Sequence, residues 1–327
     1  MRPRYSIVIP IYNERETIDA LYERLTAMLA DLDGNAEVLF VDDCSFDGSD
    51  SLLRGLRERD ERVKVIRFAR NFGHQTAITA GLDMAAGDAV VVMDADLQDP
   101  PELIPALVEK WREGYEVVYA VRSQRHGESW LKRQTARWFY RVLKRLANVD
   151  LPLDTGDFRL VDRRALAAFK SMRERRRYVR GMFSWIGFKQ IGVPYERAGR
   201  FAGEPKYSMR KSLGLAVDGV LSFSDAPLRL ALFGGFLFSL LSFVVGVAAI
   251  VAKIAGAFVV PGWASILVVV SFIGGVQLTL MGMLGLYIGR IYDEVKGRPV
   301  YVVGESYGFA NPEPLVLEPD EARTIRD

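Results

Sequence analysis

Acidic and amide side chains follow three apolar runs in the first third of the chain, and together they have the chemistry of a cation site. They are Asp94, Asp96 and Gln98 after the run 89–93, Asp42 and Asp43 after 38–41, and Tyr12 and Glu14 after 6–11. Carboxylates this close repel one another unless a cation or hydrogen-bond donors lie among them. Oxygen ligands on neighbouring residues suit Mg²⁺ or Mn²⁺. A zinc site is hard to build, because the chain has two histidines and one cysteine.

A hard divalent ion held by few carboxylates normally completes its coordination shell with the phosphate oxygens of a substrate. The clusters therefore predict a nucleoside diphosphate as the ligand. One acidic strand end by itself could instead be a helix cap, and for Ser45 and Asp47 capping is the favoured interpretation.

The elements that must position these side chains alternate in type along residues 1–121. Apolar runs predict strands at 6–11, 38–41, 63–68, 89–93 and 117–120, and amphipathic stretches predict helices at 17–32, 49–59, 75–86 and 101–111. This alternation predicts an α/β fold with a mainly parallel sheet, in which ligands bind beyond the carboxyl ends of the strands. No Gly-x-Gly-x-x-Gly follows the first strand and no Walker A sequence is present, which argues against a dinucleotide-binding or P-loop domain.

Two long uncharged stretches follow in the last third of the chain. Residues 230–252 contain no charged side chain, and a second stretch begins after Lys253 and ends before Arg290. Each is longer than the roughly 20 apolar residues that a membrane crossing requires. Basic residues on both outer flanks, and only Lys253 in the turn, predict a helical hairpin with both flanks in the cytoplasm.

Charge is distributed unevenly. Residues 1–121 carry 13 Lys/Arg and 23 Asp/Glu. Residues 122–211 carry 23 Lys/Arg and 8 Asp/Glu, and residues 212–327 carry 7 Lys/Arg and 10 Asp/Glu. A basic segment beside two membrane-spanning stretches favours anionic lipid as its partner, and no nucleic-acid-binding module accompanies it. We expect surface-lying basic helices at about 130–147 and 206–223, and interpret the run 173–180, "RERRRYVR", as a lipid-headgroup patch.

Five ordered blocks make the chain resemble a known family. They are "YSIVIPIYNE", "EVLFVDDCSFDGS", "RNFGHQTAITAGL", "DADLQDPPELI" and "TGDFRLVDRRAL". They are similar to the family 2 glycosyltransferases that load a sugar onto polyprenyl phosphate, among them dolichyl-phosphate mannose synthases and bacterial undecaprenyl-phosphate glucosyl- and aminoarabinosyl-transferases. The resemblance spans about residues 5–211, and the two-span tail is similar to that of the bacterial members.

The resemblance implies a GT-A fold in which a nucleotide-sugar lies across the strand ends. The expected nucleotide-sugar is a UDP-sugar. Base and ribose are expected beside Pro10, Tyr12, Glu14 and Asp42 or Asp43, with Asn71, Gly73 and Asp94 also near the donor. Asp94, Asp96 and Gln98 match the family's metal-binding motif for Mg²⁺ or Mn²⁺. Asp157 matches the acidic residue beside the reacting centre, so that Asp96 and Asp157 are the expected catalytic residues. Arg122, Arg133, Arg200 and Lys206 fall in segments that meet phosphates, although relatives more often carry Ser where this chain has Pro205.

The implied acceptor is a phosphate monoester with a second pKa of about 6, so it is largely dianionic at neutral pH. It can attack the anomeric carbon without a strong base, and direct displacement inverts that centre. Asp157 is therefore expected to orient the acceptor or stabilise the oxocarbenium-like centre, with proton removal from a monoanionic acceptor left open. The best expectation is glucose from UDP-glucose, while aminoarabinose, N-acetylglucosamine and mannose stay open.

The predicted organisation is a catalytic domain at 1–204, a juxtamembrane amphipathic helix at 205–227, and two spans at about 228–252 and 263–289. Residues 291–327 are expected to form a cytoplasmic tail of a multi-pass protein of the cell inner membrane. Some relatives form tetramers, which implies a homo-oligomer.

Two other functions compete. Residues 134–138, "QTARW", match the Gln-x-x-Arg-Trp motif of processive polysaccharide synthases. That motif here lacks an upstream acidic block, and two spans cannot readily enclose a polymer. A membrane-anchored protein that binds a nucleotide-sugar without catalysis is the second alternative, and the presence of Asp94, Asp96, Gln98 and Asp157 together disfavours it.

Overall fold

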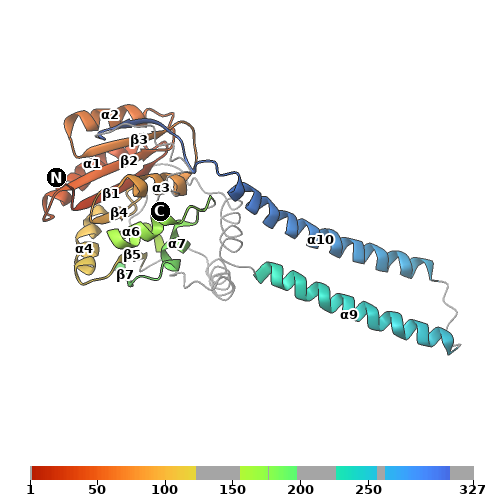
Figure 1. The fold of residues 1–327 in the computed structure, drawn as a ribbon. Helices are drawn as coiled ribbons and strands as arrows, with labels where there is room; N and C mark the ends of the chain where they lie inside the picture. The colour runs from red at the N-terminus through yellow and green to blue at the C-terminus, as the bar shows by residue number, and fades with distance from the viewer. Residues whose placement is uncertain (1, 123–154, 176, 197–225, 256–261, 310–327) are drawn as a thin grey trace, which may run out of the picture. The chain divides into compact units, whose positions relative to one another are not determined.

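The computed structural model describes residues 2–122, 155–175, 177–196, 226–255 and 262–309 (Figure 1). The chain divides into two compact units. The first contains the described residues up to 196 and those from 298 onward, and the second contains two long helices. The predicted surface helices at 130–147 and 206–223 lie outside the described residues, as do Arg133, Arg200 and Lys206.

The first unit is built on an eight-stranded sheet in the order β7-β5-β6-β4-β1-β2-β3-β8. The strands are β1 (Tyr5–Ile11), β2 (Ala36–Asp42), β3 (Val63–Phe68), β4 (Ala89–Val92), β5 (Val117–Arg122), β6 (Thr155–Asp162), β7 (Gln190–Tyr195) and β8 (Val303–Tyr307). Strands β3, β2, β1 and β4 are parallel to one another, and β5 is parallel to β7. The sheet is therefore mostly parallel, which confirms the predicted fold class, and each of the five predicted strands is present.

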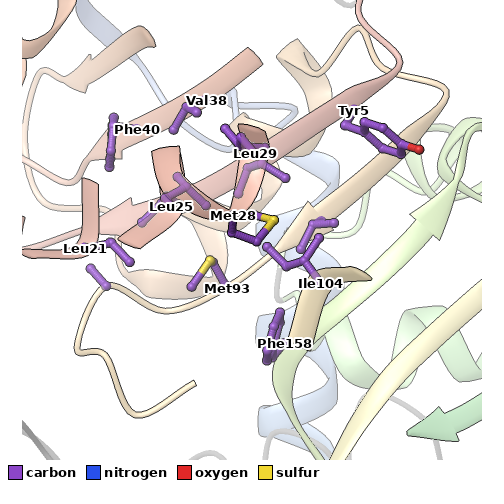
Figure 2. Packing of buried hydrophobic residues seen from close by; sticks show 14 of the residues in the cluster. Tyr5, Leu21, Leu25, Met28, Leu29, Val38, Phe40, Met93, Ile104 and Phe158 are labelled. Carbon is purple, nitrogen blue, oxygen red and sulfur yellow. The ribbon is translucent and has the colours of Figure 1, made fainter. Parts of the chain in front are cut away.

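Helices cover both faces of this sheet. One face carries α1 (Arg15–Ala30), α2 (Ser49–Arg59) and α4 (Ile104–Arg112), the last preceded by the short turn η1 (Pro101–Leu103). The other carries α3 (His74–Met84), α6 (Arg163–Ser171) and α7 (Val179–Trp185). Figure 2 shows the packing against the first face, where Leu21, Leu25 and Met28 of α1 lie beside Phe40, Met93 and Phe158. Burial of this continuous apolar layer is the main force that holds the unit together.

Strand β6 is the departure from a simple parallel order. It lies between β4 and β5 and runs antiparallel to both, with Ala89 opposite Asp162 and Val92 opposite Arg159. Asp157 precedes Arg159 by two residues, and Asp94 follows Val92 by two residues. An antiparallel strand presents its beginning at the edge where parallel strands end. The start of β6 therefore joins the acidic strand ends.

Residues after the second long helix return to the sheet. Strand β8 pairs antiparallel with β3 at the sheet edge. Tyr301 is buried, its ring stacks on Phe68 at 5.4 Å between centroids, and its hydroxyl donates to Asp83 Oδ2 at 3.1 Å. The expectation of a plain tail at 291–327 did not anticipate this strand, because five residues carry too little periodicity to identify it.

The second unit consists of α9 (Ala226–Ile254) and α10 (Trp263–Val295). Phe238 of α9 contacts Phe272 of α10 with 5.3 Å between ring centroids. Windows of 18 residues in α9 and 24 residues in α10 have mean hydropathies of 2.2 and 1.5, and none of either window is buried. Both helices are thus long and apolar enough to cross a membrane, as the two uncharged stretches predict.

Close packing of α3 on the centre of the sheet yields a first testable prediction. A Cβ at Gly81 would overlap Val8 Cγ1 and would come within 3.2 Å of Val41 Cγ2. Both valines are buried in the sheet and rigid at χ1, so the clash cannot be relieved cheaply. Gly81→Ala is expected to lower the free energy of unfolding by about 2 kcal/mol, measured by thermal or denaturant unfolding.

The matched control is Gly55→Ala in α2, where no described atom lies within 4 Å of the added Cβ. That change is expected to be neutral or to stabilise the unit by up to about 1 kcal/mol, the helix-propensity difference between Gly and Ala. Equal effects of the two substitutions would show that contact with Val8 does not limit this position.

Candidate active site at the strand ends

The loops after three parallel strands are held in an unusual backbone conformation. Asn13 after β1, Cys44 after β2 and Leu97 after β4 have φ values of 54°, 61° and 58°, in the left-handed region. Asn adopts this region readily, whereas Cys and Leu do so at a cost of about 1–2 kcal/mol each. All three lie at the carboxyl ends of neighbouring strands, where side chains must turn toward a common site. Cys44, at this turn, is half-buried.

Two buried carboxylates after β2 hold these loops together. Asp43 Oδ1 accepts from the Phe72 backbone N–H at 2.6 Å, and Oδ2 accepts from that of Gly73 at 2.8 Å. Asp42 Oδ1 accepts from the Ser45 N–H at 3.0 Å. Burial raises the pKa of both carboxyls, against these hydrogen bonds. In this structure Asp43 therefore fixes the loop that starts α3.

The remaining predicted donor residues line the same edge. Pro10 is buried within β1, whereas Tyr12 is exposed and makes an edge contact with the exposed ring of Phe46 at 6.2 Å between centroids. The Asn71 side chain donates to the Asp43 carbonyl at 3.4 Å. The Glu14 N–H donates to Ser49 Oγ at 3.2 Å. The aromatic pair is the exposed planar surface at this edge.

Asp47 accepts hydrogen bonds at two helix starts, although the N-cap residues themselves are Gly48 and Glu14. Its Oδ1 accepts from the Ser49 N–H and its Oδ2 from the Arg15 N–H, both at 3.0 Å, at the starts of α2 and α1. This single carboxylate satisfies backbone donors of two helices. Ser45 Oγ, in contrast, accepts from the Asn13 N–H at 3.0 Å and caps neither helix.

Asp94 is a half-buried carboxylate with an oxygen that lacks a hydrogen bond within the described part of the chain. Its Oδ1 is buried and makes no hydrogen bond to a described residue, and His74 Nε2 lies 3.4 Å from it. Burial, with the charges of Asp99, Asp157 and Asp96, raises the pKa of Asp94 to about 6, although His74 opposes this shift. Asp96 Oδ1 accepts from the Gln98 N–H at 3.1 Å within the same turn.

Asp157 lies at the centre of a network from three elements. Arg180 of α7 donates from Nε to Oδ1 at 2.8 Å and from Nη2 to Oδ2 at 3.0 Å. Two residues of α3 also reach Oδ2, His74 Nε2 at 3.3 Å and Gln75 Nε2 at 3.2 Å. Burial alone would raise the pKa of Asp157, but Arg180 and His74 outweigh burial and hold it well below its usual range. Arg180 and His74 therefore favour the ionised form of Asp157.

His74 joins the two acidic strand ends, because its Nε2 lies within 3.4 Å of both Asp94 and Asp157. Burial alone would lower the pKa of His74. The hydrogen bond to Asp157 and the charges of Asp94 and Asp157 outweigh burial and raise that pKa to about 9. The imidazole is thus a cation at neutral pH that bridges two carboxylates.

The donor chemistry of this site fits Mg²⁺ or Mn²⁺ with few protein ligands. The described residues contain no group of three or more His, Cys, Asp or Glu arranged to hold an ion by themselves. The buried, unbonded Asp94 Oδ1 and the neighbouring Asp96 supply two hard oxygen ligands, whereas Asp157 is occupied by Arg180. Mg²⁺ is commonly held by one or two carboxylates together with substrate phosphates and water.

Three arginines of the run 173–180 have partners that the sequence did not predict. Within the run 173–180, Arg180 binds Asp157, and Arg177 is buried and donates to the Met172 carbonyl at 2.6 Å. Arg173 pairs with Asp83 at 3.4 Å. Arg177 and Arg180 therefore have partners within the fold, against the prediction of a lipid-headgroup patch, whereas Arg173 is 52% exposed and its contact with lipid stays a prediction.

Arg122 approaches the backbone next to Asp157 and not the Asp157 carboxylate. It ends β5, and its Nη2 lies beside Gly156 of β6. His74, Gln75 and Arg180 are the site residues that sequence reasoning missed. His74 and Gln75 stand in the quoted block "RNFGHQTAITAGL", which was the available signal; nothing in the basic run singled out Arg180.

A mostly parallel sheet with acidic side chains at its ligand edge is the architecture of nucleotide-sugar-dependent transferases of the GT-A class. Residues 6–169 match the family described as Glycosyl transferase family 2. The chain is 50% identical over 308 residues to the uncharacterized glycosyltransferase YkcC of Bacillus subtilis, covering 94% of this chain and 95% of that protein. It is 44% identical to the uncharacterized glycosyltransferase sll0501 of Synechocystis, with 93% and 96% covered. It is 40% identical to the SfII prophage-derived bactoprenol glucosyl transferase of Shigella flexneri, with 93% and 98% covered.

The chain therefore belongs to glycosyltransferase family 2, and it is a glycosyltransferase with a GT-A fold.

Proposed function

We propose that the chain transfers a hexose from a nucleotide-sugar to a polyprenyl phosphate at the membrane, with glucose from UDP-glucose as the donor. The observation that carries this proposal is the meeting of Asp94 and Asp157 at His74, in one site with Arg180. Relatives named bactoprenol glucosyl transferases, similar over more than 90% of the chain, support the lipid acceptor and the sugar. The two apolar helices support a membrane location.

In this proposal the donor lies across the ends of β1, β2 and β4. Tyr12 provides a planar surface for the base, with Pro10, Glu14 and the Asp42–Asp43 pair around base and ribose. Asn71 and Gly73 approach the donor from the start of α3. Asp94, Asp96 and Gln98 would hold Mg²⁺ or Mn²⁺, which when bound neutralises charge on the departing diphosphate.

The acceptor needs little help from a base. Its phosphate is largely dianionic near neutral pH, and one of its oxygens attacks the anomeric carbon as the bond to the diphosphate breaks. Direct displacement inverts this centre and yields a β-linked product from an α-linked donor. Asp157, ionised and fully hydrogen-bonded, suits an orienting or electrostatic role better than proton removal.

The membrane arrangement is part of the proposal. Helices α9 and α10 would form a hairpin with both termini and the catalytic unit in the cytoplasm of a bacterial inner membrane. Arg133, Arg200 and Lys206 would meet the lipid phosphate together with Arg122. Assembly into a homo-oligomer follows from the family resemblance alone.

A panel of nucleotide-sugars tests this function directly. The full chain in detergent or nanodiscs is incubated with undecaprenyl phosphate, Mg²⁺ or Mn²⁺, and each donor in turn. We expect metal-dependent release of nucleoside diphosphate and formation of a single glycolipid, fastest with UDP-glucose, and loss of both in Asp96→Asn. Release that is absent with every donor would favour a binding protein, polymeric product would favour a processive synthase, and full turnover by Asp96→Asn would refute the metal role.

A further inference from the structure

We propose that Arg180 binds the phosphate group of the acceptor, and that Asp157 is the anchor that directs Arg180 into the site. The inference rests on the proposed function and extends it, because it adds a phosphate ligand from α7 and gives Asp157 a positioning role. It also removes Arg180 from the basic run that sequence reasoning assigned to lipid headgroups.

One edge of the Arg180 guanidinium is fixed and another is open. Nε and Nη2 donate to the two carboxylate oxygens of Asp157, the side-on pairing that holds the planar group in one orientation. Nη1 carries two further N–H donors and makes no hydrogen bond to a residue that the structure describes. The Arg180 side chain is 32% exposed, whereas that of Asp157 is 3% exposed. Part of the Arg180 side chain is therefore accessible, whereas the carboxylate that anchors it is not.

A second contact fixes this pair in place. Gln75 donates from Nε2 to Asp157 Oδ2 at 3.2 Å, and its Oε1 accepts from the backbone N–H of Val179 at 3.0 Å. Val179 directly precedes Arg180 and begins α7. One side chain of α3 thus positions both the carboxylate and the first turn of the helix that carries the guanidinium. A preorganised cation binds an anion with little loss of side-chain entropy.

The other described arginines near Asp157 are less suited to this role. Arg159 is 4% exposed and donates to the backbone carbonyls of Gly156 at 3.0 Å and Asp157 at 3.3 Å. Arg122 lies beside Gly156 and is hydrogen-bonded to Tyr195, so it is not anchored by Asp157. Arg180 therefore combines exposure, open donors and a place beside Asp157.

The charges around Arg180 indicate that it binds the acceptor phosphate and not the diphosphate. The diphosphate belongs with the carboxylates Asp94 and Asp96, because negative groups need a divalent cation between them and any phosphate. An acceptor phosphate brought beside Asp94 meets further negative charge, and Arg180 and His74 are the cationic groups that face it. In the transfer step a phosphate oxygen forms the bond to the anomeric carbon. The electron pair of the broken bond leaves with the diphosphate, while Arg180 exchanges no proton.

The test compares Arg180→Gln and Arg180→Lys with the wild-type full chain in nanodiscs. Arg180→Gln is expected to raise the KM for undecaprenyl phosphate about tenfold or more, the loss of hydrogen bonds to a charged group. Arg180→Lys should give a smaller rise, because it keeps the charge but not the fork of donors. The Kd of Mn²⁺–UDP, measured by calorimetry, should change less than about twofold, since nucleotide binding does not use Arg180. Arg164→Gln, a 77% exposed arginine on α6, is the matched control.

Binding of farnesyl phosphate, followed by its phosphorus NMR signal, tests the site without turnover. Wild type should bind it and Arg180→Gln should bind it at least about tenfold more weakly. Unchanged farnesyl phosphate binding in folded Arg180→Gln, or an equal loss of UDP affinity, would overturn the proposal, the latter by pointing to the donor phosphates. Failure of wild type to transfer any sugar would refute the proposed function instead, and the farnesyl phosphate result would still decide the role of Arg180.

Discussion

Replacing Asp94 by asparagine is expected to lower sugar transfer about a thousandfold, equivalent to about 4 kcal/mol in the transition state. Asp94 Oδ1 is buried and has no hydrogen-bond partner among the described residues, and burial, with the charges of neighbouring carboxylates, raises the pKa of Asp94 although His74 opposes the shift. Asparagine keeps the shape but removes the charge that would hold Mg²⁺ or Mn²⁺ at the diphosphate. The same variant should lose Mn²⁺-dependent UDP binding, measured by calorimetry or by electron paramagnetic resonance of Mn²⁺.

Asp88→Asn is the matched control for this experiment. Asp88 directly precedes β4, at the opposite end of the strand from Asp94, and its side chain is 53% exposed beside Arg2 and Arg163. Transfer and UDP binding by Asp88→Asn should equal those of wild type. Retention of Mn²⁺-dependent UDP binding by a folded Asp94→Asn protein would refute the assignment of Asp94 as a metal ligand.

Asp157→Asn is expected to lower transfer about a hundredfold, the size of effect that follows when a catalytic group is misplaced by about an ångström. The substitution removes the charge that holds Arg180 and His74, so both side chains lose their fixed orientation. The measurement is kcat/KM for undecaprenyl phosphate between about pH 5.5 and 8.5, on either side of the second phosphate pKa near 6.

The pH dependence separates positioning from proton removal. If Asp157 positions its neighbours, both proteins lose rate together as pH falls through the acceptor pKa, and the ratio of wild type to Asp157→Asn stays constant. If Asp157 takes the proton of a monoanionic acceptor, the ratio shrinks as pH rises, because a dianionic acceptor no longer needs a base. Asp83→Asn is the control, since Asp83 is also a buried carboxylate paired with an arginine, Arg173, outside the site.

Local sequence information was sufficient for the donor side of the site. Apolar runs predicted β1, β2 and β4, and each run is followed at once by the polar residues that its carboxyl end must present. Parallel neighbours then bring Asp43 and Asp94 to a single edge without further assumptions. The same reasoning placed Asp47 near the start of α2, where it accepts from the Ser49 N–H. It did not predict that Ser45 would accept from the Asn13 N–H instead of capping a helix.

The contacts of Asp157 could not be predicted in this way. They depend on the direction of β6, which alternation of strands and helices leaves undetermined, and on its insertion between β4 and β5. They also depend on α7, because a helix of seven residues is too short for its sequence pattern to show which face is buried. The basic run 173–180 was therefore interpreted as one surface patch, although its arginines contact different partners in the structure.

The sequence by itself determined the class of enzyme, the acidic side chains at the ends of β2 and β4, and the two helices able to cross a membrane. These properties follow from residue type and short-range order. Only the tertiary structure decided that His74 lies between Asp94 and Asp157, and that Arg180 turns inward to bind Asp157. The physical reason is that a buried charged side chain pairs with a group on whichever element packs against it. Residues 74, 94, 157 and 180 are brought together by the packing of their elements and not by their spacing in the chain.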